Sequence, residues 1–202
     1  MRRAGAMCVA LLGVAATGCG SDPSGDSDAL IDAEQYCTDQ GGELVTRHAT
    51  GNTNGDPSTW LRLAGEITLC EFESTADGNT TRISVDLVTL SSEQPTLAAL
   101  AYLSKVPPVM PDEPSANPAA YNCDVGLGGA RDFGNSPASS GGWVDENQET
   151  FTVMDLCVFA DMSAIDEWGI TYYSQGAVRG ADLATKLRYQ PDGGLPSVFV
   201  SN

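Results

Sequence analysis

The chain has 202 residues, of which 27 are acidic and 10 are Lys or Arg, giving a formal net charge of −17 at pH 7. A surface this acidic repels nucleic-acid phosphates and anionic lipid headgroups, so we expect no nucleic-acid partner. The composition instead favours an acidic surface that keeps the body dissolved in water, with attraction of a specific cation or basic partner as the alternative.

The first eighteen residues predict a signal peptide. Arg2 and Arg3 precede a run of small and apolar residues that extends from Ala4 to Ala16. As a helix this run would be about 20 Å long, which is too short for a hydrocarbon core of about 30 Å. We therefore expect residues 1–18 to be removed during export.

The next residues predict a lipid anchor. Ala16-Thr17-Gly18-Cys19 resembles the lipobox of bacterial lipoproteins, which implies that Cys19 is lipidated and holds the protein to a membrane. The alternative is an ordinary signal peptide cut nearby, which leaves Cys19 as a free thiol. Gly20 after the lipidated Cys favours the outer membrane if the cell has two membranes. Residues 19–28 are polar and acidic, and they predict a lipidated flexible tether.

Four cysteines remain in the exported body, and an even number in an oxidising compartment predicts two disulfides. They are Cys37, Cys70, Cys123 and Cys157, separated by 33, 53 and 34 residues. These separations lack the close pairs typical of metal sites, so we expect no metal and no cofactor. Three connectivities are open, and an internal repeat selects Cys37 with Cys70 and Cys123 with Cys157.

That repeat aligns the two halves of the chain on their second cysteine. Leu69–Phe72 corresponds to Leu156–Phe159, and the second glycine of a Gly-Gly pair lies 28 residues before each cysteine. Ile83 and Ile170 match 13 residues after it, and each begins a strand-like run. Such a series predicts tandem duplication, with a first repeat at 29–114 and a second at 115–202.

Each repeat is expected to contain a helix, three strands and a second helix. In the first repeat Asp28 would cap a helix whose buried face holds Leu30, Ile31 and Tyr36. The strands are expected at 43–46, 60–73 and 82–90, with a hairpin turn at 76–79 and a helix at 96–105. In the second repeat the last strand is expected at 170–174 and the last helix at 181–189. The predicted fold class is α+β, with two tandem small units, each an antiparallel three- to four-stranded meander packed with helices and holding one disulfide.

The second repeat is similar to a domain-of-unknown-function family of small exported bacterial proteins that is labelled hemolysin. The similarity covers the first repeat loosely, and Met162 and Ile165 replace a turn Gly and a Cys that the family tends to have, so its disulfide pattern is not carried over. The label implies no activity, and the exported part shows no segment suited to forming a pore. The matching segments are Asn117–Cys123, Gly128-Gly129, Leu156–Ser163 and Asp166–Trp168.

No motif specifies a reaction. His48 is the only histidine and lies in a polar segment, so we interpret it as an exposed bystander rather than a catalytic base. Asn52, Asn54 and Asp56 alternate as in a calcium loop, but Pro57 stands where that loop needs Gly, and Leu63 replaces the bidentate Glu. We therefore predict no catalytic residue and no metal ligand.

One short segment is a candidate recognition surface: Asp166, Glu167 and Trp168. Acidic pairs such as Asp166-Glu167 and Asp145-Glu146 are expected on solvated faces. Trp168 is the candidate recognition aromatic, with packing in the core as the alternative.

We expect a non-catalytic cell-envelope lipoprotein, a binding or structural module that uses sheet edges or hairpin tips to contact an envelope or extracellular protein. One alternative is an inhibitor of an extracellular hydrolase, and another is an enzyme with a carboxylate-based site. Carboxylates converging in a pocket would favour the enzyme, whereas shallow clefts would favour the module.

Overall fold

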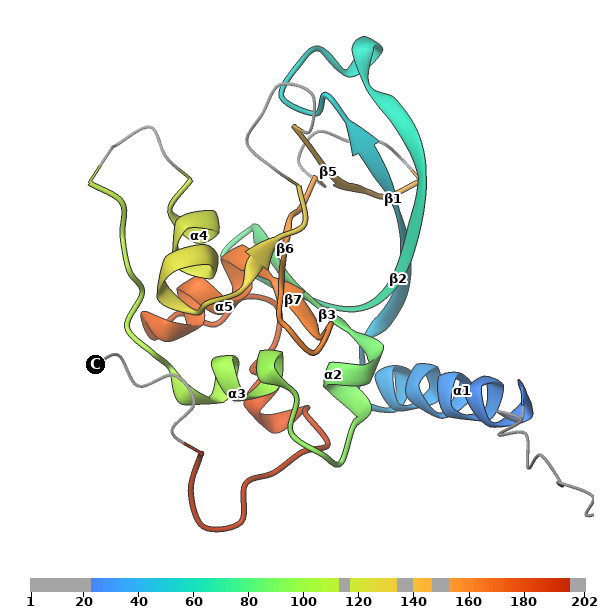
Figure 1. The fold of residues 1–202 in the computed structure, drawn as a ribbon, viewed down its shortest axis with the longest axis vertical. Helices are drawn as coiled ribbons and strands as arrows, with labels where there is room; N and C mark the ends of the chain where they lie inside the picture. The colour runs from blue at the N-terminus through green and yellow to red at the C-terminus, as the bar shows by residue number, and fades with distance from the viewer. Residues whose placement is uncertain (1–22, 113–116, 134–139, 147–152, 197–202) are drawn as a thin grey trace, which may run out of the picture.

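The described part of the chain has an α+β fold, with one seven-stranded antiparallel sheet and two disulfides. The computed structural model describes residues 23–112, 117–133, 140–146 and 153–196, so the predicted signal peptide and Cys19 lie outside the described residues. Figure 1 shows a strongly curled sheet with the helices gathered around its lower part. The strand order is β4-β6-β7-β3-β2-β1-β5.

The first half of the chain forms the longest strands. The predicted hairpin turn is confirmed, because Asp77 and Gly78 both have positive φ (52° and 77°), as a two-residue type I′ turn requires. The helix expected at 96–105 is also present, capped by Thr96. The elements of this half are α1 (Pro23–Asp39), β1 (Glu43–Gly51), a 3₁₀ turn (Pro57–Thr59), β2 (Leu61–Ala76), β3 (Asn79–Asp86), α2 (Leu87–Ser91) and α3 (Leu97–Ser104).

The second half has shorter strands and departs from the prediction at its end. Residues 170–174 are helical rather than a strand, because Asp166 accepts hydrogen bonds from the N–H groups of Trp168 and Gly169 and so caps a helix. Only Leu183–Thr185 of the predicted last helix is helical. The elements of this half are α4 (Pro118–Tyr121), a π-helical turn (Asn122–Gly126), β4 (Ala130–Arg131), β5 (Gly141–Val144), β6 (Leu156–Val158), β7 (Ala164–Asp166) and α5 (Glu167–Ser174).

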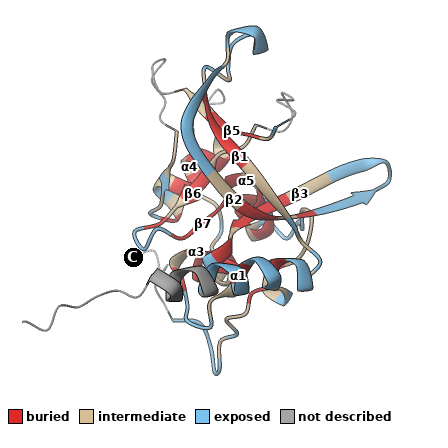
Figure 2. Cartoon of the chain, turned by 90° about the vertical axis from the view of Figure 1, so that its right-hand side faces the viewer, coloured by how far each residue is buried: buried red, intermediate tan, exposed pale blue. Residues whose placement is uncertain are grey.

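The prediction for the first helix is partly wrong. α1 begins at Pro23, inside the expected tether, rather than after Asp28. Leu30 and Ile31 are 54% and 64% exposed, whereas Ala33 and Cys37 are buried. The disulfide decides which face is buried, because it turns Cys37, and Ala33 one turn before it, toward the sheet. Figure 2 shows the exposed outer face of α1 and the exposed tip of the β2–β3 hairpin.

Both disulfides have the predicted pairing, Cys37 with Cys70 and Cys123 with Cys157. Each joins a helical segment to a strand, β2 or β6. The N–H of Gly42 donates to the carbonyl of Cys37, and the N–H of Gly129 donates to that of Cys123. A Cβ at either glycine would collide with a disulfide sulfur, so both positions require Gly.

The two predicted units are not separate, because their strands share one sheet. β3 and β7 pair at its centre, where Val85 lies opposite Ile165. On either side of this joint the order β3-β2-β1 mirrors β7-β6-β4. Cys70 lies opposite Val85 and Cys157 lies opposite Ile165.

This register changes which residues of the two repeats correspond after the second cysteine. Val85 corresponds to Ile165, whereas the sequence alignment matched Ile83 with Ile170. The alignment failed because the second hairpin is shorter: Val85 follows Cys70 by 15 residues, but Ile165 follows Cys157 by only 8. Met162 has a φ of 66° in this second hairpin, a conformation that favours the Gly that the similar family tends to have there.

The main core lies between the sheet and the helices. Cys70, Phe72, Ile83 and Val85 point into it from β2 and β3. The opposite face of the sheet carries a smaller cluster of Leu69, Leu156 and Ala164. Because side chains alternate along a strand, Glu71 and Ser84, neighbours of Cys70 and Val85, also lie on this second face.

Candidate functional site

Three acidic side chains come together where β4 ends, β6 begins and α5 begins. Asp132 follows β4, and Asp155 precedes β6, which pairs with β4. Glu167 is the first residue of α5, and its N–H donates to the carbonyl of Asp155 at 3.2 Å. We call Asp132, Asp155 and Glu167 the carboxylate cluster.

Asp132 is held in place by hydrogen bonds. Its Oδ2 accepts from the indole Nε1 of Trp143, and its Oδ1 accepts from the N–H of Leu156 at 3.1 Å. Both bonds stabilise the ionised form, yet burial outweighs them and raises the pKa of this carboxyl. These two hydrogen bonds therefore fix the position of the Asp132 carboxyl group in the cluster.

Asp155 is the member of the cluster that lines a cavity. Its Oδ1 is buried and has no hydrogen-bond partner among the described residues. Burial, together with the neighbouring charge of Asp132, raises its pKa to about 7, although the charge of Arg131 acts in the opposite direction. This carboxyl therefore changes its charge near neutral pH.

Glu167 is fully buried, and neither of its carboxyl oxygens has a hydrogen-bond partner among the described residues. Burial raises its pKa to about 8, and the charges of Asp155 and Asp132 add to this effect. At neutral pH the side chain is therefore mostly protonated. An ionised carboxylate without a partner here would be expensive.

The cavity beside the cluster has a volume of about 190 Å³ and a mostly polar lining. Since a water molecule takes up about 30 Å³, the cavity has room for about six waters, less than a typical site for a drug-sized ligand. It is therefore suited to one side chain or a similarly small group. Its described lining is Asn54, Asn117, Ala120, Arg131, Phe133, Ser140, Gly141 and Asp155.

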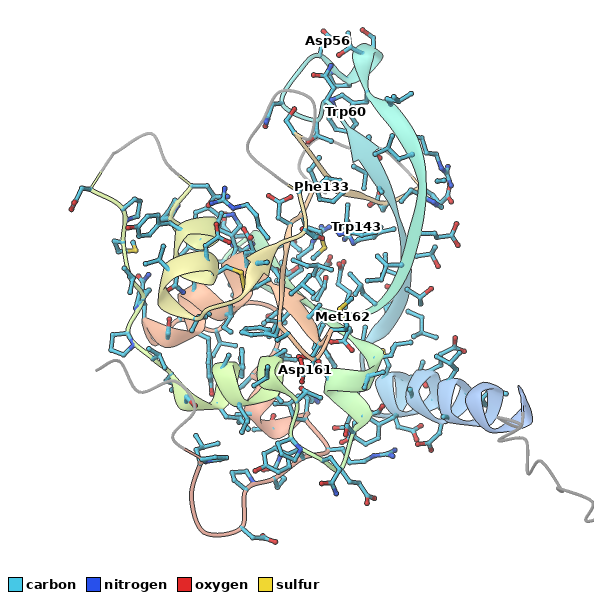
Figure 3. The ribbon with its side chains drawn as sticks, viewed as in Figure 1. Asp56, Trp60, Phe133, Trp143, Asp161 and Met162 are labelled. Atoms are coloured by element: carbon cyan, nitrogen blue, oxygen red, sulfur yellow. A yellow bond between two sulfur atoms is a disulfide. The ribbon has the colours of Figure 1, made fainter. Side chains whose placement is uncertain are left out.

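Arg131, the positively charged residue in this lining, already forms an ion pair. The Nε and Nη2 atoms of Arg131 donate to Oδ2 of Asp124 at 2.9 and 2.6 Å. Phe133 in this lining packs edge-on against Trp143 of β5 with a centroid distance of 5.7 Å (Figure 3). Asp155 is therefore the acidic residue in the described lining, and its Oδ1 has no hydrogen-bond partner among the described residues.

The prediction that Asp166, Glu167 and Trp168 form an exposed recognition surface is wrong. Asp166 is buried as the cap of α5, and Glu167 is buried in the carboxylate cluster. Trp168 is half-buried and stacks on Tyr172 at 5.6 Å. The solvated face expected for Asp166-Glu167 is absent because β7 pairs with β3 and β6 and lies inside the sheet.

The prediction that His48 is exposed is also wrong, because β1 extends to Gly51 and buries it. Its Nε2 lies 2.6 Å from Oε1 of Glu146. The calcium-loop residues serve a turn: Asp56 caps Ser58, and the Asn52 amide donates to Thr59. Among the described residues no group of three or more His, Cys, Asp or Glu side chains is arranged to hold a metal ion.

Sequence reasoning did not single out Asp132 and Asp155. Asp155 lies two residues before Cys157, directly before a strand whose cysteine was expected in the core. An acidic residue directly beside such a strand is the signal that could have found it. Asp132 has no comparable signal, because the strand before it has only two residues.

No protein-family model, curated protein or solved structure matches the chain. The similarity to the hemolysin-labelled family therefore stays a prediction. In the part of the chain that the structure describes, no helix has the length and apolar character to cross a membrane. The two disulfides are consistent with an oxidising compartment outside the cytoplasm.

Proposed function

We propose that the protein is an exported, lipid-anchored binding protein of the cell envelope that receives a cationic group in the cavity beside Asp155. A Lys or Arg side chain of a partner protein is the ligand that fits this site best. The observation that carries the proposal is that Asp155 lines the cavity and that its buried Oδ1 has no hydrogen-bond partner among the described residues. Catalysis is not required for this role.

The electrostatics of the cluster support a cationic ligand. A positive charge within about 4–6 Å of a carboxyl favours its ionised form and compensates for burial. Arg131 supplies only part of that compensation, because it is bound to Asp124. The size of the cavity suits an ammonium or guanidinium group, and the acidic surface would speed the approach of a basic partner.

Calorimetry with n-butylammonium as the probe would test the proposal. We expect saturable binding to the mature protein and at least a tenfold loss in Asp155→Asn. Asp77→Asn is the matched control, since it removes the same charge from the exposed tip of the β2–β3 hairpin and Asn tolerates that turn. Equal binding to Asp155→Asn and wild type, or no binding of butylammonium to either, would contradict the proposal.

An enzyme with a carboxylate site is a second candidate, favoured by one observation. Asp155 and Glu167 have pKa values of about 7 and 8, so one can accept a proton while the other holds one near neutral pH. Turnover of a panel of chromogenic glycosides and peptides, lost in Asp155→Asn, would favour the enzyme. Binding of cations without turnover would favour the binding protein.

We also infer that the two halves of the sheet are copies of one unit. The mirrored strand order, the shared Cys-Gly-Gly arrangement and the equivalent registers of Cys70 and Cys157 support this. Under this inference the carboxylate cluster belongs to the second copy alone.

A further inference from the structure

A second, smaller cavity of about 70 Å³ lies on the face of the sheet that carries Glu71. Three arginine residues line it: Arg47 in β1, Arg82 in β3 and Arg179 after α5. Only eight Lys and Arg residues follow residue 18, against 27 acidic residues. Three of the eight therefore converge on one cavity, which we call the arginine pocket.

One partly buried carboxylate, that of Glu71, pairs with two of these arginines. Oε2 of Glu71 lies 2.6 Å from Nη2 of Arg47, and Oε1 lies 3.8 Å from Nη1 of Arg82. The hydroxyl of Ser84 also donates to Oε2 at 2.7 Å. Arg82 lies 3.7 Å from Glu73 as well, but that carboxylate is 54% exposed and is screened by water.

The third arginine keeps a donor available. Nε of Arg179 is buried and has no hydrogen-bond partner among the described residues. Its guanidinium lies 5.3 Å from the ring of Tyr172. Asp166 also lines the pocket. Its Oδ1 accepts from the N–H groups of Trp168 and Gly169, and burial raises the pKa of this carboxyl although the charge of Arg179 acts in the opposite direction. A buried N–H without a partner is unfavourable, so an acceptor in the pocket would be stabilised.

We propose that the arginine pocket binds the carboxylate of a small ligand. Guanidinium groups match carboxylates in a planar, two-point arrangement, and the pocket has room for about two waters, the size of a carboxylate rather than of a whole metabolite. Trp168 also lines the pocket and offers a flat apolar surface to the rest of the ligand. This site does not depend on the proposed cation site.

Nitrogen-edited NMR of the arginine Nε–H groups in the mature protein tests this proposal with acetate, benzoate and inorganic phosphate as probes. We expect the Arg179 signal, identified by its absence in Arg179→Gln, to shift saturably with acetate. Benzoate should bind at least threefold more tightly because its ring can contact Trp168. Saturation by phosphate but not by either carboxylate would overturn the proposal.

The variants make the test specific. Arg82→Gln, at a partly exposed position, should weaken acetate binding at least fivefold, read from backbone signals, even if Arg179→Gln fails to fold. Arg188→Gln is the matched control, because Arg188 pairs with Asp32 outside the pocket at 2.8 Å. Equal acetate binding to wild type, Arg82→Gln and Arg188→Gln, or an Arg179 signal that does not respond to acetate, would also overturn the proposal.

Discussion

The two halves of the sheet use the same scaffold but differ where the carboxylate cluster lies. Each residue of the carboxylate cluster has a counterpart in the first half. The counterpart of Asp132 is found by counting from the Gly-Gly pair, that of Asp155 by counting from the second cysteine, and that of Glu167 as the first residue of the equivalent helix. None of those counterparts is acidic, so neither the sheet nor the disulfide requires a carboxylate there. The counterparts of Asp132, Asp155 and Glu167 are Val45, Thr68 and Leu87.

This difference distinguishes the residues that stabilise the fold in both halves from the carboxylates that are present in the second half only. Leu87 is buried at the start of α2, which is the position that Glu167 takes in α5. A buried Leu is favourable there, whereas a buried Glu without partners is not. Elements that both halves keep should therefore contribute stability, and elements found in one half should contribute binding.

Removing a disulfide should have the largest effect and should be similar in the two halves. The loops closed by Cys37–Cys70 and Cys123–Cys157 span 33 and 34 residues. Chain entropy then predicts that replacing either pair by Ala lowers the free energy of unfolding by about 3–4 kcal/mol. Urea unfolding measures both, and a difference above about 2 kcal/mol would show that the halves are not equivalent scaffolds.

Replacing Glu167 by Leu, the residue type at the equivalent position of the first half, should stabilise the protein at high pH. Glu167 has a pKa of about 8 in the folded state, above its unfolded value of 4.5, so the folded state binds more protons and wild-type stability falls as pH rises between these values. Glu167→Leu should therefore gain on the order of 2 kcal/mol over wild type on going from pH 4 to pH 9. Urea unfolding of Glu93→Gln, which removes an exposed charge, should show no comparable pH-dependent gain.

The affinity for butylammonium should also depend on pH. Asp155 must be ionised to hold the cation, and its pKa is about 7. Binding should therefore strengthen about tenfold between pH 6 and pH 8, as calorimetry can measure. An affinity that stays constant over this range would mean that another group holds the cation.

The helix caps should show a smaller effect that is again shared by the halves. Asp86 caps α2 and Asp166 caps α5. Replacing either by Ala should lower the free energy of unfolding by about 1–2 kcal/mol, whereas Asn keeps the capping oxygen and should change it less. Thermal unfolding of the four variants measures this, and a loss with Asn equal to that with Ala would argue against capping.

Local patterns predicted the local parts of the fold. The Cys and Gly-Gly spacing predicted both disulfides, and Asp77-Gly78 predicted the hairpin turn. The pattern could not show that β3 and β7 pair, because nothing in either strand specifies its neighbour across the joint. It also placed Ile170 in a strand, since the β propensity of 170–174 is overridden by the cap at Asp166.

The carboxylate cluster was beyond the reach of sequence reasoning for a related reason. Its members are far apart in the chain and meet only because β4 pairs with β6 and α5 starts beside them. In a chain with 27 acidic residues, no local feature marks these three as buried. Burial, which sets their pKa values, is a property of the assembled sheet.

The pairing of Val85 with Ile165 has an evolutionary consequence. In a symmetric dimer of identical chains, a residue on the two-fold axis faces its own copy, and these two residues are counterparts that face each other. If the chain arose by duplication, as we propose, a single-copy ancestor would have closed the same edge by forming a homodimer. Fusion into one polypeptide then freed one subunit to acquire the carboxylates while the other preserved the original architecture.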